Sequence, residues 1–379
     1  MTARLAAVTA AMDAMYPPAL AQEWDAVGLV CGDPDAPVTR VLLAVDPVAV
    51  VAQEALAGGF DLLVTHHPLF LRGTSTVAAT QPKGRMVHEL ITGGSGLFVA
   101  HTNADTARPG VSDALAALFD LRDTEPVVPV PDEPLDLLVV FVPVGSATVL
   151  RDALTAAGAG ELGDYDRCTW TTNGSGTFRP LEGAHPALGE LGRLEQVQEA
   201  RIEVVLARSR RDCVLAALHR THPYEVPAYH LLEPAAGPGR RGYGRVGDLP
   251  NALTVGELTA LAAEVLPATA TGVRASGDPD AVVTRLAVGG GSGDDALGAA
   301  AAGGAQAFLT ADLRHHRASE APEGLALLDA AHWATEWPWL PDAAARLARL
   351  VDVETAVSNR CTDPWTLSRP TTCSRSPRA

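Results

Sequence analysis

The sequence has few cysteines, and their arrangement excludes two kinds of structure. The five cysteines are scattered along the chain, and no two of them form a Cys-x-x-Cys pair. An odd number of dispersed cysteines does not fit a disulfide framework, and zinc sites built from thiolates use closely spaced pairs. A reducing compartment is the natural setting for such a chain, so we expect the protein in the cytoplasm.

Long apolar runs are also missing. No stretch of about 18 apolar residues is present, so the sequence offers no candidate for a helix that spans a membrane. The alanine-rich segment 1–22 resembles a signal peptide superficially, but Asp13 interrupts its apolar stretch. Its polar positions fit an amphipathic first helix instead.

Positive charge is scarce as well. The chain has 29 Lys and Arg residues against 45 Asp and Glu residues, which gives a formal net charge of −16. An acidic chain is repelled by phosphate backbones and by anionic lipids, so we expect neither general nucleic-acid binding nor membrane association. Because aromatic residues make up only 5% of the chain, Val, Leu and Ala should build most of the core.

The first third of the chain alternates short apolar segments with helix-like segments. Strands are predicted at 41–45, 62–65 and 97–100, and helices at 48–57, 84–92 and 111–119. Short apolar strands separated by helices of about ten residues indicate βαβ units and a mostly parallel sheet.

Two linker-like segments then enclose a region with its own rhythm. The segment 126–134 holds four prolines, and the segment 234–244 is rich in proline and glycine. Between them the pattern predicts two β-α-β passes, which suggest a ferredoxin-like unit with a hairpin-like region at 169–178. We therefore assign residues 125–244 to an inserted domain.

After the insert the α/β rhythm resumes. Helices are predicted at 255–266, 295–302 and 335–350, and strands at 273–276, 285–288, 307–310 and 326–330. The fold class is thus α/β: a metal-binding domain in two parts, 1–124 and 245–367, with the α+β insert between them. The composition of the tail 368–379 predicts disorder.

Three clusters of possible metal ligands follow predicted strands. His66 and His67 come directly after the strand 62–65, and Asp105 follows the strand 97–100. His332 and Glu336 follow the strand 326–330 with the i, i+4 spacing that places two side chains on one face of a helix. Neighbouring side chains on a strand point to opposite faces, so His66 and His67 either converge because the chain turns or ligate different metals.

The shared position of the three clusters predicts a single site. In open α/β sheets, ligands bind outside the carboxyl ends of the strands. Three imidazoles and two carboxylates are too many for one tetrahedral catalytic zinc ion with its water. They suit two divalent ions about 3.5–4 Å apart with a bridging carboxylate, and zinc, iron and manganese all accept this ligand set.

Other candidates for the site have weaker signals. His101 could be a ligand, a partner of a ligand or a core histidine, and His315 lies in a polar helical stretch. The glycine-rich segment 289–293 could form a tight turn or hold an anion with its backbone N–H groups. A Gly-x-Ser-x-Gly elbow is missing, which excludes the usual serine hydrolase arrangement.

At these residues the sequence resembles the dinuclear-metal-centre hexameric proteins, also called GTP cyclohydrolase type 2 homologues or the Nif-three-like family. The matching stretches are 24–29, 65–69, 101–105, 290–293 and 332–336. Departures are Ala26, where Asn is usual, and Ala311, where Gly is usual.

The resemblance implies specific roles and an assembly. His67 and Asp105 would serve one metal, His66 and His332 the other, and Glu336 would bridge both. The insert, with its stretches 177–180 and 222–225, resembles a CutA-like or P-II-like domain. Members form homohexamers, arranged as trimers of dimers.

Two classes of function follow from these observations. In the first, the protein is a metal-dependent hydrolase of the GTP-cyclohydrolase type that acts on a small molecule such as a nucleotide, through a water bridging the two ions. His101 or His315 would then shuttle protons near neutral pH. In the alternative, the protein is a non-enzymatic metal-handling or regulatory interaction protein.

Overall fold

The computed structural model describes residues 2–235, 237 and 239–369. Its contacts divide the chain into two compact units, which we call the large unit (Met1–Val130 with Arg240–Ala379) and the insert (Pro131–Gly239). The short strands β8 (Val128–Pro129) and β13 (Gly242–Tyr243) pair with each other in the large unit, although the sequence placed both in the inserted region. In the described part of the chain, no helix is long and apolar enough to cross a membrane.

The first half of the large unit supplies most of a five-stranded sheet. Its order is β19-β4-β5-β6-β2, and all neighbours are parallel except β2 and β6. The strands are β2 (Gly28–Cys31), β4 (Arg40–Ala44), β5 (Leu62–Thr65), β6 (Gly96–Val99) and β19 (Glu354–Val357). The mostly parallel sheet expected from the βαβ pattern is present here.

The second half forms a separate six-stranded sheet, with the order β15-β18-β17-β16-β14-β7. Only the pairs β16/β17 and β17/β18 are parallel, so the expectation of a mostly parallel sheet is wrong for this half. The strands are β7 (Arg122–Glu125), β14 (Arg245–Thr254), β15 (Arg274–Ser276), β16 (Val282–Ser292), β17 (Ala307–Ala311) and β18 (Ala326–Ala330). A further two-stranded pair joins β1 (Ala3–Arg4) to β3 (Pro37–Val38).

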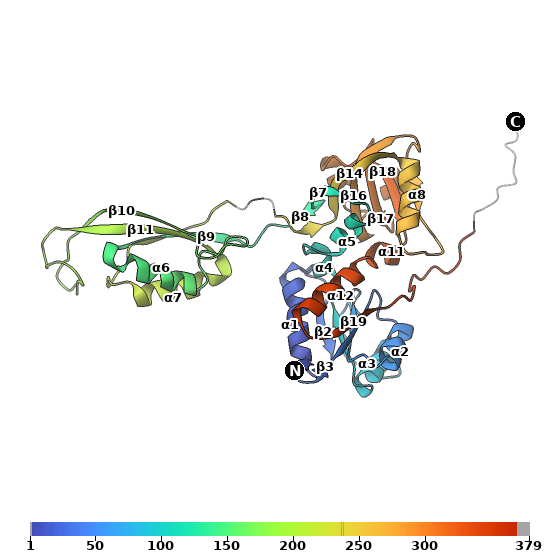
Figure 1. The fold of residues 1–379 in the computed structure, drawn as a ribbon, viewed down its shortest axis with the longest axis horizontal. Coiled ribbons are helices and arrows are strands. Elements are labelled where there is room, and N and C mark those ends of the chain that lie inside the picture. Colours follow the sequence, from blue (N-terminus) through green and yellow to red (C-terminus); the bar gives the residue numbers. More distant parts are fainter. Residues whose placement is uncertain (1, 236, 238, 370–379) are drawn as a thin grey trace. The chain divides into compact units, whose positions relative to one another are not determined.

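The two halves exchange edge strands. β7 from the first half joins the six-stranded sheet, and β19 from the second half joins the five-stranded sheet. Figure 1 shows the sheets in the upper and lower parts of the large unit, with α4, α5, α11 and α12 between them. The helices of this unit are α1 (Leu5–Met15), α2 (Ala49–Ala57), α3 (Pro82–Thr92), α4 (Thr102–Thr106), α5 (Val111–Ala117), α8 (Val255–Val265), α9 (Leu297–Ala302), α10 (His315–Ser319), α11 (His332–Glu336) and α12 (Trp339–Leu350).

The amphipathic helices α1 and α12 close the core between the sheets. The N-terminal segment forms a helix whose side chains at Leu5, Val8, Met12 and Met15 are buried, as its polar pattern predicts. Just after α1, the hydroxyl of Tyr16 accepts a hydrogen bond of 2.9 Å from Nε1 of the buried Trp339 on α12. The two ends of the large unit are therefore packed into one core.

Two expected elements differ in the large unit. The single helix predicted at 335–350 is two helices, because Trp337 and Pro338 separate α11 from α12. A proline has no backbone N–H and cannot donate the next hydrogen bond of α11, so the break follows from the sequence in hindsight. The glycines 289–291 belong to β16 and do not form a separate loop, so an anion cradle at a helix start is not present there.

The insert contains one antiparallel sheet with the order β10-β11-β9-β12. Its strands are β9 (Leu135–Pro143), β10 (Thr169–Phe178), β11 (Glu195–Ala207) and β12 (Tyr229–Leu232), and its helices are α6 (Ala147–Ala156) and α7 (Arg211–Thr221). The region 169–178 is one continuous strand paired along its length with β11, so the hairpin expected there is wrong. The insert has its own hydrophobic core between the sheet and the two helices.

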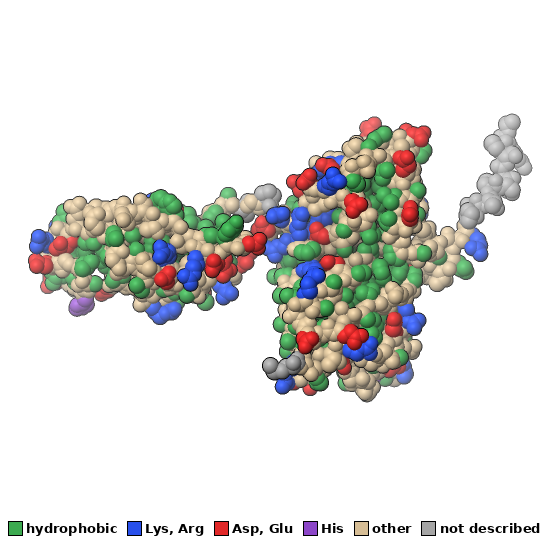
Figure 2. Space-filling model, viewed as in Figure 1, with side chains coloured by type: hydrophobic (Ala, Val, Ile, Leu, Met, Phe, Trp, Pro, Cys, Tyr) green, Lys and Arg blue, Asp and Glu red, His purple; other side chains and the backbone are tan. Residues whose placement is uncertain are grey.

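Charged side chains of both signs lie on the surface, and the cysteines of the described residues form no disulfide. Figure 2 shows acidic and basic side chains interspersed over the face that it presents. The four cysteines in the described residues are free thiols, and Cys373 lies outside those residues together with most of the tail expected to be disordered.

Candidate metal centre

The predicted ligands come together between the two sheets. His66 and His67 follow β5, Asp105 lies in α4 after β6, and His332 and Glu336 lie in α11 after β18. Each side chain therefore leaves the carboxyl end of a parallel strand, where ligands bind in open α/β sheets.

The neighbours His66 and His67 converge because the chain turns at the end of β5. The hydroxyl of Thr65 donates a hydrogen bond of 2.9 Å to the carbonyl of His67, which closes this turn. The two rings lie 5.2 Å apart between centroids. The structure therefore shows the turn that the sequence left open, and both imidazoles lie in the same cluster.

Glu336 occupies the middle of the site. Its Oε1 lies 2.9 Å from His332 Nε2 and 3.4 Å from His66 Nε2, and its Oε2 lies 3.2 Å from His67 Nε2. Only 3% of the glutamate is exposed. A single buried carboxylate thus faces three imidazoles, the arrangement expected of a bridging ligand.

The histidines are held from outside by their Nδ1 atoms. Four acceptors do this: Ala100 O for His66 (2.9 Å), Asp46 for His67 (2.7 Å), Asp25 for His101 (2.9 Å) and Asp312 for His332 (2.7 Å). A carbonyl or carboxylate can only accept, so each Nδ1 carries the proton. Metal-binding histidines are oriented in this way, with the other nitrogen free for the metal.

Three inward-facing atoms make ion-pair contacts only and have no hydrogen-bond partner. His66 Nε2, Asp105 Oδ1 and Glu336 Oε2 are buried and have no hydrogen bond. Leaving a buried polar atom unpaired costs about 1–3 kcal/mol, more for a charged group. His67 Nε2 and His332 Nε2 also lie only 3.2 Å apart, close to the roughly 3.3 Å between two nitrogens on one tetrahedral zinc ion. The residues present therefore fit divalent metal ions.

Short distances join side chains that the resemblance assigns to different metals. His67 approaches His332, and Asp105 Oδ1 lies 3.6 Å from His66 Nε2. The family pattern pairs His67 with Asp105 and His66 with His332. Two overlapping groups of side chains could hold a metal ion, His66 with His67 and His101, and His67 with His332 and Glu336.

The electrostatics of the centre favour bound cations. Burial opposes a charge on His67, but attraction to Glu336 and the hydrogen bond with Asp46 raise its pKa to about 10. The same balance raises the pKa of His332 to about 11. Burial also opposes a charge on Glu336, yet attraction to His67, His332 and His66 holds its pKa well below the usual range. Burial raises the pKa of Asp105 to about 6. The ionised Glu336 therefore attracts positive charge, either as protons on the neighbouring histidines or as metal ions that replace those protons.

The two candidate proton shuttles lie in different surroundings. His101 joins the cluster, with its ring centroid 5.2 Å from that of His66 and 5.5 Å from that of His67. Burial, with the nearby His66, lowers the pKa of His101 to about 4, so its Nε2 is available as a ligand or base. His315 lies on α10, is exposed and borders a different hollow beside Arg274 and Asp329, so no recorded contact supports its proposed role.

Two glycines of β16 allow close approach, Gly291 to the candidate ligands and Gly290 to α5. A Cβ atom on Gly291 would lie 2.5 Å from Glu336 Oε1 and 3.0 Å from His332 Nε2. Its φ of +64° also lies in the left-handed region that favours glycine. On Gly290, a Cβ atom would meet Val111 at 2.6 Å. The glycine run therefore serves the metal centre by close approach.

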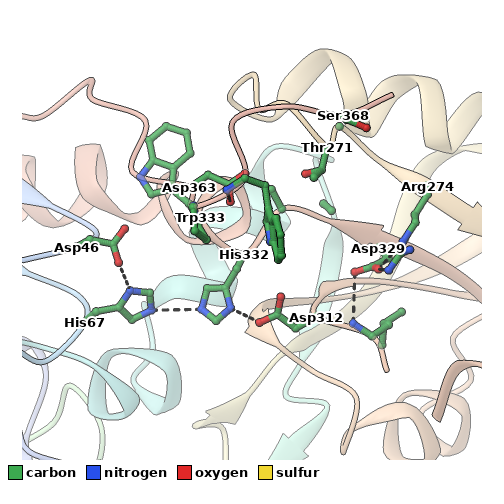
Figure 3. Close-up of a pocket in the computed structure, with 16 residues that line it drawn as sticks. Asp46, His67, Thr271, Arg274, Asp312, Asp329, His332, Trp333, Asp363 and Ser368 are labelled. Carbon is green, nitrogen blue, oxygen red and sulfur yellow. Dashed lines mark hydrogen bonds and ion pairs between the residues drawn. The ribbon is translucent and has the colours of Figure 1, made fainter. Parts of the chain in front are cut away.

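A cavity of about 760 Å³ opens beside the metal centre. Figure 3 shows Asp46, His67, His332 and Asp312 joined by a line of contacts along one side of this cavity, and Arg274 beside Asp329 on the other. Pockets of about 300–1,000 Å³ are typical of small-molecule sites. The centre therefore has space for a substrate next to its ligands.

Sequence reasoning missed the carboxylates that orient the histidines. Asp46 and Asp312 each follow a strand of their sheet, β4 and β17, at the same edge as the ligands. That position after an apolar strand was the available signal. Ala311, the departure from the family pattern, is the buried last residue of β17, and Asp312 after it takes the left-handed φ of +57°.

Comparison with known proteins gives consistent matches. The family model described as Duf34/NIF3 (NGG1p interacting factor 3) matches residues 3–364. A protein of Mycobacterium tuberculosis named GTP cyclohydrolase 1 type 2 homolog is 48% identical over 376 residues, covering 98% of this chain and 99% of its own. One of the same name from Streptomyces coelicolor is 42% identical, covering 96% and 94%. The crystal structure of a Bacillus cereus protein related to NIF3 superimposes with a TM-score of 0.82 at 32% identity, covering 97% of this chain and 100% of its own.

Proposed function

The chain belongs to the Duf34/NIF3 (NGG1p interacting factor 3) family, and from this membership and the geometry of the centre we propose that it is a hydrolase that depends on two divalent metal ions. The observation that carries the proposal is the set of buried, inward-facing atoms of His66, Asp105 and Glu336 that have no hydrogen bond and lie beside an open cavity. A purely structural site closes its ligand shell, whereas this one adjoins space for a substrate.

The chain's own residues would hold the two ions. His67, His332 and Glu336 would hold one ion. His66 and His101, which lie with His67 in a second group, would hold the other, and Asp105 Oδ1 lies 3.6 Å from His66 Nε2. When bound, two cations supply Lewis acidity that activates water and stabilises negative charge developing on the substrate. Asp46 and Asp312 fix the orientation of the imidazoles, so the site changes little when a substrate enters.

His101 is the group best placed to accept a proton. Asp25 holds its Nδ1, and its low pKa keeps Nε2 unprotonated at neutral pH. A base with a pKa of about 4 removes protons weakly by itself, so His101 would act on a proton already acidified by the centre. Its role is therefore to relay a proton and to orient the reacting groups.

The names of the relatives suggest GTP as the first substrate to test. Protein loaded separately with zinc, manganese and iron would be incubated with GTP and with a panel of nucleotides and phosphoesters. We expect turnover that depends on the metal and disappears in Glu336→Gln. Absence of turnover with every fully loaded form would favour the alternative of a metal-handling or regulatory protein.

Two structural expectations accompany this proposal. We propose that the insert is a ferredoxin-like unit related to CutA or P-II domains, which agrees with its strand order β10-β11-β9-β12 and its two helices. We also propose a homohexamer built as a trimer of dimers. Light scattering coupled to size-exclusion chromatography would test it against the chain mass of 39.4 kDa.

A further inference from the structure

The insert contains a hollow of about 320 Å³ that has no part in the metal centre. Two stretches that the sequence singled out, 177–180 and 222–225, both border it. They are separated by more than 40 residues in the chain and meet because β10 ends beside the loop that follows α7. A convergence of two distinctive stretches on one hollow points to a binding site.

Two carboxylates border the hollow, Glu225, which accepts from the backbone N–H of His185, and Glu199 on β11. Its Oε1 accepts a hydrogen bond of 2.9 Å from the hydroxyl of Tyr224. A Cβ atom on Gly176 would lie 2.1 Å from Oε2 of Glu199, which is too close for a side chain at position 176. The carboxylate therefore packs against the backbone of β10. Glycine at position 176 therefore allows the carboxylate to occupy this position, and Tyr224 fixes its orientation.

Tyr224 is in turn held by His222. Nε2 of His222 donates to the carbonyl of Phe141 at 2.9 Å, and its Nδ1 accepts from the backbone N–H of Tyr224 at 3.0 Å. This pattern requires a neutral imidazole, which has one donor and one acceptor. Burial lowers the pKa of His222 and so favours that form. The ring and hydroxyl of Tyr224 are thus positioned before any ligand arrives.

The walls of the hollow are apolar and aromatic. The rings of Phe178 and Tyr224 lie 5.7 Å apart at an angle of 59°. The segment 181–192 closes one side, because Gly192 N donates to Pro180 O at 2.8 Å and His185 N donates to Glu225 at 3.0 Å. The remaining lining is mainly small or apolar: Ala184, Pro186, Ala187, Leu188, Val226 and Ala228.

We propose that this hollow binds a small organic cation with an apolar body, and that Glu199 is its anionic partner. Tyr224 engages only one oxygen of the half-buried carboxylate, and the rings of Phe178 and Tyr224 line the same hollow. Aromatic faces and a carboxylate together attract ammonium groups. Arg179 also borders the hollow, but it is exposed, so solvent screens its charge more than that of Glu199.

Binding of two probes with the same phenyl body tests the proposal. Phenethylamine is cationic at neutral pH, and 3-phenylpropionate is anionic. Titrations of the metal-loaded full chain would be followed by calorimetry and by saturation-transfer NMR, because bare carboxylates of the metal centre would also attract a cation. We expect phenethylamine to bind one site per chain, at least about tenfold more tightly than 3-phenylpropionate.

Three variants locate the site. Glu199→Gln keeps an acceptor for Tyr224 but removes the charge, and should weaken phenethylamine binding about tenfold. Val226→Lys adds a like charge at a rim position that is 81% exposed, so it should weaken binding without affecting folding. Glu203→Gln, on the same strand but outside the hollow, should change nothing. Equal binding of the two probes, no binding of phenethylamine, or unchanged binding in both Glu199→Gln and Val226→Lys would overturn the proposal.

Discussion

Asp46 accepts a hydrogen bond of 2.7 Å from Nδ1 of His67, and the hydroxyl of Thr362 contacts the other oxygen of the same carboxylate. The C-terminal segment after β19 therefore supports a histidine that begins a loop nearly 300 residues earlier in the chain. This arrangement fixes the direction of His67 Nε2 toward Glu336.

Removal of this support should weaken metal binding. We expect Asp46→Ala to lower metal affinity by about 10–100-fold, the usual effect of losing a group that orients a ligand. Competition with a chromophoric chelator would measure it in wild type and variant. Asp295→Ala, at a carboxylate that is 81% exposed, is the matched control and should bind as wild type does. Equal affinity in Asp46→Ala would contradict the assignment of His67 as a ligand.

Metal affinity should rise with pH. In the metal-free centre the pKa values of His67 and His332 are raised to about 10 and about 11. Both imidazoles are therefore cationic at neutral pH, with a second proton on Nε2. A metal must displace those protons, and each displaced proton adds about one unit to the slope of log affinity against pH below these pKa values. Calorimetry in buffers of different ionisation enthalpy would count the protons. Release of no proton at pH 7 would contradict this prediction.

Gly291→Ala should abolish normal metal occupancy. A Cβ atom there would displace Glu336 Oε1, in addition to the backbone strain of about 1–2 kcal/mol for a side chain at positive φ. Gly163→Ala separates the two effects, because Gly163 has a φ of +59° and nothing within 4 Å of the added atom. Elemental analysis should find metal loss only in Gly291→Ala. Loss in both variants would point to strain alone.

Asp113→Ala should destabilise the large unit. Arg245 is fully buried and makes a two-pronged ion pair with Asp113 at 2.7 and 2.6 Å, which joins the two halves of this unit. Removing one partner of a buried pair leaves an unpaired charge and costs about 3–5 kcal/mol. Urea unfolding would measure it, with Asp35→Ala at an 84%-exposed side chain as the control. A loss below about 1 kcal/mol, the range of surface pairs, would show that Arg245 finds other partners.

Deletion of the insert should leave the metal centre intact. Val130 N donates to Arg241 O at 3.0 Å, so the two points where the insert leaves the large unit are adjacent. A variant that joins Val130 to Arg240 through a short glycine-serine linker should stay folded and retain the metal content of the intact chain. Thermal unfolding and elemental analysis would test this. Aggregation with loss of metal would show that the large unit depends on the insert.

The sequence by itself determined the local features of this protein. Strands such as β5 and β18 were predicted at their observed bounds, because buried parallel strands read as short continuous apolar runs. The five candidate ligands were found because ligands gather at the carboxyl ends of such strands. The proline that separates α11 from α12 was readable as well, although the long helical pattern around it obscured the break.

Only the tertiary structure decided how the two halves meet. Two separate sheets exchange β7 and β19, and this brings His67 and His332 to 3.2 Å although 265 residues separate them in the chain. The alternation of residues along a strand predicts which face of the sheet each residue occupies. It does not predict which sheet the strand joins. Asp46 and Asp312 follow apolar strands in the sequence, but which histidine each one supports, and the close approach at Gly291, depend on how the sheets pack.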